Sequence, residues 1–307
     1  MDTTPDNSEK KKTSSVREAT FSINESFGGR LLTEEEDVFE QNAWDHVEWD
    51  DEHLALAKKC IEEQKLYPVT EKDAYMTHPE RYWDQFYGKN EGKFFMNRRW
   101  IAQEFPELLD LLKEDAGEKS ILEIGCGAGN TIWPILKENK NSNLKIFAVD
   151  YSEKAIDVVK QNPLYDAKFC SASVWDLAGS DLLRSIEEAS IDAITLIFCF
   201  SALSPDQWQQ AIENLYRLLK PGGLILFRDY GRLDLTQLRA KKNRILSENF
   251  YIRGDGTRVY YMTNEELVDV FGKNFKIIQN GVDKRLIVNR KKRVKMYRCW
   301  LQAKFQK

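Results

Sequence analysis

The chain has 307 residues, 42% of them hydrophobic, and a formal net charge of −4 at pH 7. This length suits one large α/β domain with an extension. The sequence has no run of about 18 apolar residues and its first residues are polar, so neither a membrane span nor a secretory signal is expected. Five cysteines without a CxxC pair favour reduced thiols in a cytoplasmic protein, with the nucleus left open.

Charge is unevenly distributed along the chain. Residues 34–52 contain acids but no Lys or Arg, whereas the segment from Lys284 to the end contains Lys and Arg but no acid. A basic face on an acidic protein would produce this asymmetry, and so would a solvated basic strand pair beside an acidic arm. All three histidines precede the expected core, so no metal site is expected.

The chain divides into three parts by composition. Residues 1–26 are polar and rich in Ser, Thr and Lys, which predicts a disordered tail. Residues 27–78 form an acidic segment punctuated by aromatic residues, and helical spacing in its latter part predicts that it packs on the main domain. The main domain is expected over residues 79–307.

Within the main domain, apolar runs alternate with helical segments. Strands are predicted at 121–125, 144–150, 167–174, 191–200 and 224–230, followed by two closing strands at 275–280 and 294–305. Helices are predicted at 130–139, 153–162, 205–220 and 263–272, and a less regular insert at 232–262. The alternation predicts a parallel sheet with helical crossovers, completed by an antiparallel pair. This is the seven-stranded, Rossmann-like α/β fold of class I methyltransferases.

A glycine-rich turn follows the first predicted strand, with Glu123, Gly125 and Gly127 in the run EIGCGAG. Glycines there allow a tight turn and bring backbone N–H groups against a ligand. Asp150 ends the next strand, where it would accept hydrogen bonds from a ribose. Asp176, with Leu177 beside it, follows the third strand and would accept from an adenine amine.

The spacing of these glycines separates two cofactor classes. Dinucleotide-binding proteins require GxGxxG, but the sequence here is GxGxG with an acid two residues before it. This pattern suits S-adenosylmethionine, and a nucleotide fold with another ligand is the alternative.

Several longer motifs carry a family resemblance. The runs RYWDQFYGKNEGKFFMNRRW, QNPLYD, LIFCFSALSP, KPGGLILFRDYG and NFYIRGDGTRVYYMT resemble the tRNA 3-methylcytidine methyltransferases over about residues 79–307. The acidic segment FGGRLLTEEEDVFEQNAWDHVEWD looks like the branch that acts on threonine tRNA. The resemblance leaves two roles for residues 27–78, which are tRNA recognition and packing on the domain. The resemblance implies methylation of cytidine 32 in the anticodon loop, with Trp83 and Tyr87 covering the cofactor and Ile197 on the sheet side.

That reaction places demands on further residues. The target nitrogen lies on the Watson–Crick edge, so the base must leave its stack to reach the methyl group. Asp229 is expected to bond the exocyclic amine and Tyr230 to stack or hydrogen-bond nearby. Phe94 and Arg98 are expected to wall the flipped base or hold its phosphate, although core packing is the alternative for Phe94.

Basic residues interleaved with aromatic ones suit RNA binding. The expected RNA-binding residues are Arg99, Arg239, Lys241, Arg253, Arg258, Lys291, Lys292 and Arg293. The expected partner is the anticodon stem-loop of a tRNA, and the need for an auxiliary protein is left open. Two other functions remain: a class I methyltransferase of a small molecule or protein, and a catalytically silent RNA-binding scaffold subunit.

Overall fold

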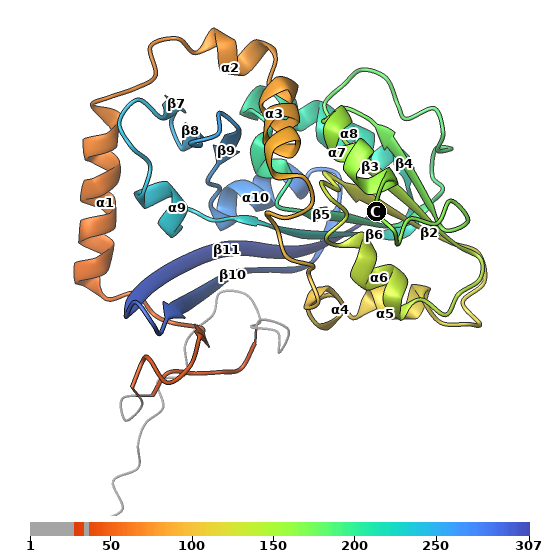
Figure 1. Cartoon of the computed structure of the whole chain (residues 1–307), viewed down its shortest axis with the longest axis horizontal. Helices are drawn as coiled ribbons and strands as arrows, with labels where there is room; N and C mark the ends of the chain where they lie inside the picture. The colour runs from red at the N-terminus through yellow and green to blue at the C-terminus, as the bar shows by residue number, and fades with distance from the viewer. Residues whose placement is uncertain (1–27, 34–36) are drawn as a thin grey trace, which may run out of the picture.

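A computed structural model describes residues 28–33 and 37–307. An eight-stranded sheet runs through the molecule in the order β1-β10-β11-β6-β5-β2-β3-β4 (Figure 1). Its strands are β1 (Ala43–Asp45), β2 (Lys119–Ile124), β3 (Leu144–Asp150), β4 (Cys170–Val174), β5 (Ile191–Ile197), β6 (Leu219–Tyr230), β10 (Lys276–Asn289) and β11 (Val294–Gln306). The expected disordered tail, residues 1–26, lies outside the described residues.

The pairing confirms the predicted seven-stranded arrangement and adds one strand to it. β4, β3, β2, β5 and β6 pair in parallel, and β11 and β10 continue the sheet in the antiparallel sense. β1 then pairs with the outer side of β10, with Trp44 opposite Leu286. The prediction missed β1 because three residues are too few to show an alternating pattern.

Helices cover both faces of the sheet because successive strand residues point to opposite sides. On one face, Leu122 and Ile124 of β2 share a core with α8 (Trp208–Leu218) and α10 (Asn264–Phe271). On the other face, Ile121 shares a core with α4–α7. These helices are α4 (Ile101–Glu104), α5 (Glu107–Leu111), α6 (Ile132–Glu138) and α7 (Glu153–Lys160).

Three of the predicted segments need a correction. The helix expected at 205–220 begins as a 3₁₀ turn, Pro205–Gln207, and α8 ends at Leu218, because β6 begins at Leu219 and not at residue 224. β10 runs on to Asn289 instead of ending at residue 280. The insert at 232–262 is more regular than expected: it contains α9 (Leu235–Leu238) and a small sheet of β7 (Ile245–Ser247), β8 (Phe250–Ile252) and β9 (Arg258–Tyr260).

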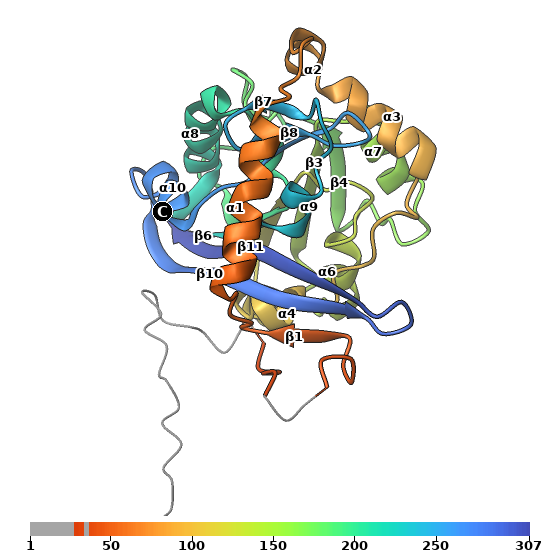
Figure 2. The same cartoon turned by 90° about the vertical axis from the view of Figure 1, so that its left-hand side faces the viewer.

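The N-terminal segment contributes α1 (Asp51–Lys65), which packs on the main domain, and α2 (Asp73–Thr77). The main domain then begins with α3 (Glu80–Asn90). Figure 2 shows α1 crossing in front of the β10–β11 hairpin. The buried Gln64 of α1 donates to the carbonyl oxygens of Gln237 (3.1 Å) and Ala240 (3.2 Å), and so caps α9. Across the described ranges, no helix has the length and apolarity to cross a membrane.

Candidate active site

A cavity of about 600 Å³ opens at the carboxyl ends of the parallel strands. Ligands bind at this edge in open α/β sheets, and the volume lies within the usual range for small-molecule sites. The residues that line the cavity come from the ends of successive strands, from β4 at one side to β11 at the other.

The β4 and β3 part of the wall contains the acids expected to bind adenosine. Asp176 and Leu177, which follow β4, line the cavity with Tyr151 and Trp175. Asp150, at the end of β3, is 8% exposed. Its carboxylate accepts from the backbone N–H of Gly127 (2.8 Å), and burial raises its pKa to about 6. The same carboxylate therefore fixes the glycine-rich turn and faces the cavity.

The glycine-rich turn follows β2 and requires residues without a side chain. Gly125 and Gly127 have φ angles of 66° and 55°, in the left-handed region. A Cβ atom at Gly125 would collide with the Cys199 side chain, and one at Gly127 with the hydroxyl of Tyr87. The turn thus presents its backbone to the cavity at a point where larger residues do not fit.

Glu123 lies beneath this turn and does not line the cavity. It is 1% exposed and accepts a hydrogen bond from the Thr195 hydroxyl. Burial raises its pKa to about 7, although the Arg98 guanidinium, 3.7 Å away, opposes the shift. Arg98 also donates to the Thr131 hydroxyl (2.6 Å) and does line the cavity. Ile197, at the end of β5, is fully buried in the core and also lies outside the cavity wall.

α3 covers the cofactor side of the cavity. Trp83 and Tyr87 line it from above, and their rings stack with centroids 6.2 Å apart. Asp84, between them, accepts from the Ser152 hydroxyl (2.7 Å) and from the backbone N–H of Lys154 (3.2 Å) at the start of α7. Trp83 and Tyr87 were predicted to cover the cofactor, and their position over the cavity depends on this contact between α3 and α7.

The β5, β6 and β11 part of the wall is aromatic. Phe198 follows β5, and its ring centroid lies 5.0 Å from that of Tyr230 and 6.1 Å from that of Trp300. Trp300 is the cross-strand partner of Tyr230, which brings β11 into the site. Trp100, which precedes α4, completes this group. Of these four aromatic residues, only Tyr230 was predicted from the sequence to lie in the site.

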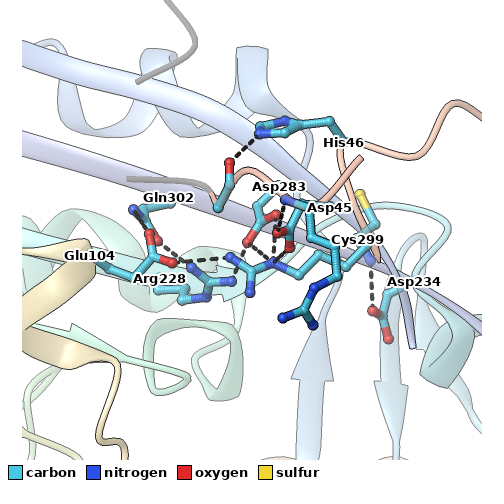
Figure 3. A network of polar contacts seen from close by, with 11 residues as sticks. Asp45, His46, Glu104, Arg228, Asp234, Asp283, Cys299 and Gln302 are labelled. Atoms are coloured by element: carbon cyan, nitrogen blue, oxygen red, sulfur yellow. Dashed lines mark hydrogen bonds and ion pairs between the residues drawn. The ribbon is translucent and has the colours of Figure 1, made fainter. Parts of the chain in front are cut away.

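A buried polar network supports the aromatic wall (Figure 3). Arg228 binds Asp283 and Gln302, and its guanidinium lies 5.0 Å from the Trp100 ring and 4.8 Å from the Trp300 ring. Such close cation–aromatic contacts hold both indoles in place.

The same network reaches the N-terminal segment. Arg285 donates to Asp283 (2.9 Å) and Glu104 (3.0 Å) and forms an ion pair with Asp45 of β1 (3.3 Å). Arg298 donates to Asp234 (2.9 Å). Sequence reasoning missed these residues because their partners lie far apart in the chain. The one local signal was the spacing of Arg298 and Trp300, which places both side chains on the same face of β11.

Several predicted site residues occupy other positions. Asp229 is 3% exposed and lies behind the cavity wall, where it accepts from the backbone N–H groups of Ser201 and Tyr230, each at 2.8 Å. Phe94 is 58% exposed and packs on Phe86, outside the cavity wall. A direct contact of Asp229 or Phe94 with the base therefore stays a prediction that this geometry does not support.

The predicted RNA-binding residues separate into two groups. Arg253 and Arg258 line the cavity. Arg258 is 5% exposed and donates to the Ala202 carbonyl and to Gln207, so it forms part of the wall, and its contact with RNA stays a prediction. The other residues are exposed: Arg99, Arg239, Lys241, Lys291, Lys292 and Arg293. The last three lie in the turn between β10 and β11, not in a strand as expected.

The described residues contain no group of three His, Cys, Asp or Glu side chains arranged to hold a metal ion. The cavity is lined by the backbone turn, by acids, by aromatic rings and by arginines. One end of the cavity resembles a nucleoside site and the other an aromatic slot.

Comparisons with known proteins agree with this geometry. A family profile described as "Methyltransferase domain" matches residues 122–225. The chain is 52% identical to the tRNA(Thr) (cytosine(32)-N(3))-methyltransferase of Saccharomyces cerevisiae over 91% of this chain and 45% of that protein. It is 42% identical to the tRNA N(3)-cytidine methyltransferase METTL2 of Danio rerio over 92% of this chain and 89% of that protein. The chain thus spans about half the length of the yeast relative and most of the fish relative.

A solved structure shows the same fold. It is an S-adenosylmethionine-dependent methyltransferase from Anabaena variabilis, with a TM-score of 0.53 and 14% identity over 74% of this chain and 94% of that one. The fold, the glycine-rich turn and the relatives lead to one assignment. The chain belongs to the tRNA N(3)-cytidine methyltransferase family and is an S-adenosylmethionine-dependent enzyme.

Proposed function

We propose that this protein methylates N3 of cytidine 32 in the anticodon loop of threonine tRNA. One observation carries the proposal: a single cavity joins a nucleoside-binding end at β3 and β4 to an aromatic slot at β5, β6 and β11. The identity to the yeast threonine-tRNA enzyme supports the choice of substrate.

The strand order indicates how the cofactor would lie. Asp176 would accept from the adenine amine and Asp150 from the ribose, which directs the amino-acid end toward the turn after β2. Arg98 lies there, between Glu123 and Phe198 (5.9 Å from its ring centroid). We therefore propose that Arg98 faces the amino-acid end of the cofactor instead of the flipped base. When bound, S-adenosylmethionine supplies a methyl group on a positively charged sulfur.

The aromatic slot suits a flipped cytosine. Its rings, Phe198, Tyr230 and Trp300, provide faces on which a base stacks, which is how proteins usually hold unstacked bases. N3 carries a free lone pair at neutral pH, so no strong base is needed near it. The residues of the slot act by holding the base in line with the methyl group, an orientation that two molecules meeting in solution would rarely reach.

The slot also suits a positively charged product. Methylation leaves a positive charge on the cytosine ring, which aromatic faces attract. The arginines behind the slot would repel that charge if they were unpaired, but Arg228 and Arg285 share the carboxylates of Asp283, Glu104 and Asp45. Their pairing therefore cancels the charge of these two arginines behind the slot.

The full-length protein tests this proposal with labelled S-adenosylmethionine and total tRNA that lacks 3-methylcytidine. We expect label in 3-methylcytidine after nucleoside analysis, and its loss when cytidine 32 of threonine tRNA is replaced by uridine. Label in a different nucleoside, or label only in a small molecule or protein from an added extract, would contradict the proposal. An inactive protein that binds tRNA would support a scaffold role.

An auxiliary protein stays a prediction. The same assay addresses it when the purified chain is compared with and without extract. A rate that rises only with extract would show that a second protein takes part.

A further inference from the structure

Six arginines line the cavity, and five of them are bound to other groups of the protein. These five are Arg98, Arg228, Arg258, Arg285 and Arg298. Each donates to a carboxylate, hydroxyl, amide or carbonyl oxygen at hydrogen-bonding distance. Their guanidinium groups therefore shape the wall and leave little capacity for a ligand.

The sixth arginine, Arg253, differs from these five. Within residues 28–33 and 37–307, no hydrogen bond or ion pair reaches its guanidinium group. The group is half-buried and lies 5.0 Å from the ring centroid of Tyr230, at the aromatic end of the cavity. Burial disfavours its charge, and the carboxylates of Asp255 and Asp229 favour the charge without bonding to it. A bound anion would add the hydrogen-bonded partner that the guanidinium lacks.

The backbone of Arg253 is held in place before any ligand binds. Its N–H donates to the Thr257 carbonyl (2.8 Å), and its carbonyl accepts from Gly256 N–H (3.1 Å) and from the Arg244 guanidinium (3.2 Å). Gly256 itself has a φ of 87° and lies against the Tyr82 ring, where no side chain fits. The turn between β8 and β9 thus presents Arg253 to the cavity with little freedom to lose on binding.

We propose that Arg253 binds a phosphate of the substrate RNA next to the flipped cytidine. The inference rests on the proposed function. Arginine forms strong, charge-assisted hydrogen bonds with phosphates, and its contact with Tyr230 places the charge beside the slot that would take the base. The carboxylate of the cofactor is the other anion available. Arg98 is the better partner for it, because Arg98 donates to the Thr131 hydroxyl directly after the glycine-rich turn.

A chemical double-mutant cycle tests the contact. The full-length protein and its Arg253→Gln variant are titrated with threonine-tRNA anticodon stem-loops in which a neutral methylphosphonate replaces, in turn, each phosphate flanking cytidine 32. We expect one substitution to weaken binding to the unaltered protein by about tenfold or more, the scale of a lost hydrogen bond between charged groups. Arg253→Gln should weaken binding of the natural RNA by a similar factor and show no further loss with the altered RNA.

Two controls distinguish the possible failures. Arg217→Gln removes an exposed arginine of α8 that pairs with Glu188, and should change nothing. Calorimetry with S-adenosylmethionine should give the same affinity for Arg253→Gln and for the unaltered protein. Independent losses from the two substitutions, or a weaker cofactor affinity with unchanged RNA affinity, would overturn the proposal. If the unaltered protein forms no 3-methylcytidine, the proposed function fails instead.

Discussion

Asp229 acts on the site through the backbone that it holds in place. Its two oxygens accept from the backbone N–H groups of Ser201 and Tyr230, so it joins the loop after β5 to the end of β6. Both loops contribute to the cavity wall, and Tyr230 lines it directly.

We predict that Asp229→Asn lowers the free energy of unfolding by about 1–3 kcal/mol. An amide keeps one acceptor oxygen and turns its NH₂ toward a backbone N–H, which leaves a buried donor unpaired. The single-turnover rate at saturating tRNA and cofactor should stay within about threefold of the unaltered protein. A fall of about 10²–10³ at unchanged stability would instead establish Asp229 as an electrostatic partner of the base.

Asp150 gives the cofactor site a pH dependence. Burial raises its pKa to about 6, so the protonated form dominates below that pH in the free protein. The ionised carboxylate is the better acceptor for ribose hydroxyls. Affinity for S-adenosylmethionine should therefore weaken as pH falls, by about tenfold between pH 7 and pH 5.

Calorimetry across this range checks the Asp150 prediction. In Asp150→Asn, affinity should be lower at pH 7 and nearly independent of pH. If the variant keeps the pH dependence, the titrating group is Glu123, whose pKa is about 7, and not Asp150.

The limits of sequence reasoning at this scale have a physical cause. Gly125, Gly127, Asp150 and Asp176 occupy the cavity edge because each lies at the end of a strand or within three residues after it, so their positions follow from local sequence. Trp300 depends on a cross-strand pair with Tyr230, seventy residues earlier. No local pattern reports a pairing of that kind.

At the scale of elements, the contact between α3 and α7 fixes the position of α3, the helix that covers the cofactor site. Asp84 accepts from both Ser152 and Lys154, at the first turn of α7. Asp84→Ala should free α3 and reduce the affinity for S-adenosylmethionine by about tenfold, because Trp83 and Tyr87 would have to be ordered on binding.

Hydrogen exchange and calorimetry together check this role. Exchange should rise in α3 and at the start of α7 and stay unchanged in the β10–β11 hairpin. An affinity loss without faster exchange in α3 would mean that Asp84 acts on the cofactor directly. Asp157→Ala, which removes an exposed carboxylate of α7 paired with Lys154, is the matched control.

The elements that sequence patterns missed are short. β1, β7, β8 and β9 have three residues each, and α9 has four. Segments of this length show no period, so their structure depends on the partner: β10 for β1, and Gln64 of α1 for α9. The long parallel strands and the capped helix at Thr263 carried their own signals and were predicted.

At the scale of the molecule, the charge asymmetry of the sequence places a basic turn at one end of the hairpin. Lys291, Lys292 and Arg293 are exposed there. Replacing all three by Ala should make the slope of log affinity for tRNA against log salt shallower, by about 0.7–0.9 for each phosphate that the protein no longer neutralises. Affinity for S-adenosylmethionine should not change.

Filter binding at several salt concentrations measures these slopes. The matched control replaces Lys137 of α6, Lys145 of β3 and Lys168 just before β4, which are also exposed. β3 and β4 lie at the opposite end of the strand order from β10. Equal slopes for the two triple variants would identify the basic turn as a solvated edge without a role in RNA binding.

The pairing of β1 with β10 has a consequence for how copies of the molecule meet. Opposite β1, the residues Arg285, Leu286 and Ile287 would otherwise present unbonded N–H and C=O groups, and an exposed strand edge is a template for pairing with another chain. β1 occupies this edge, and the N–H of Asp45 on β1 donates in turn to the Arg30 carbonyl oxygen (2.7 Å). Without this segment, the outermost strand of one molecule would be free to continue the sheet of the next, so self-association is the expected result of removing it.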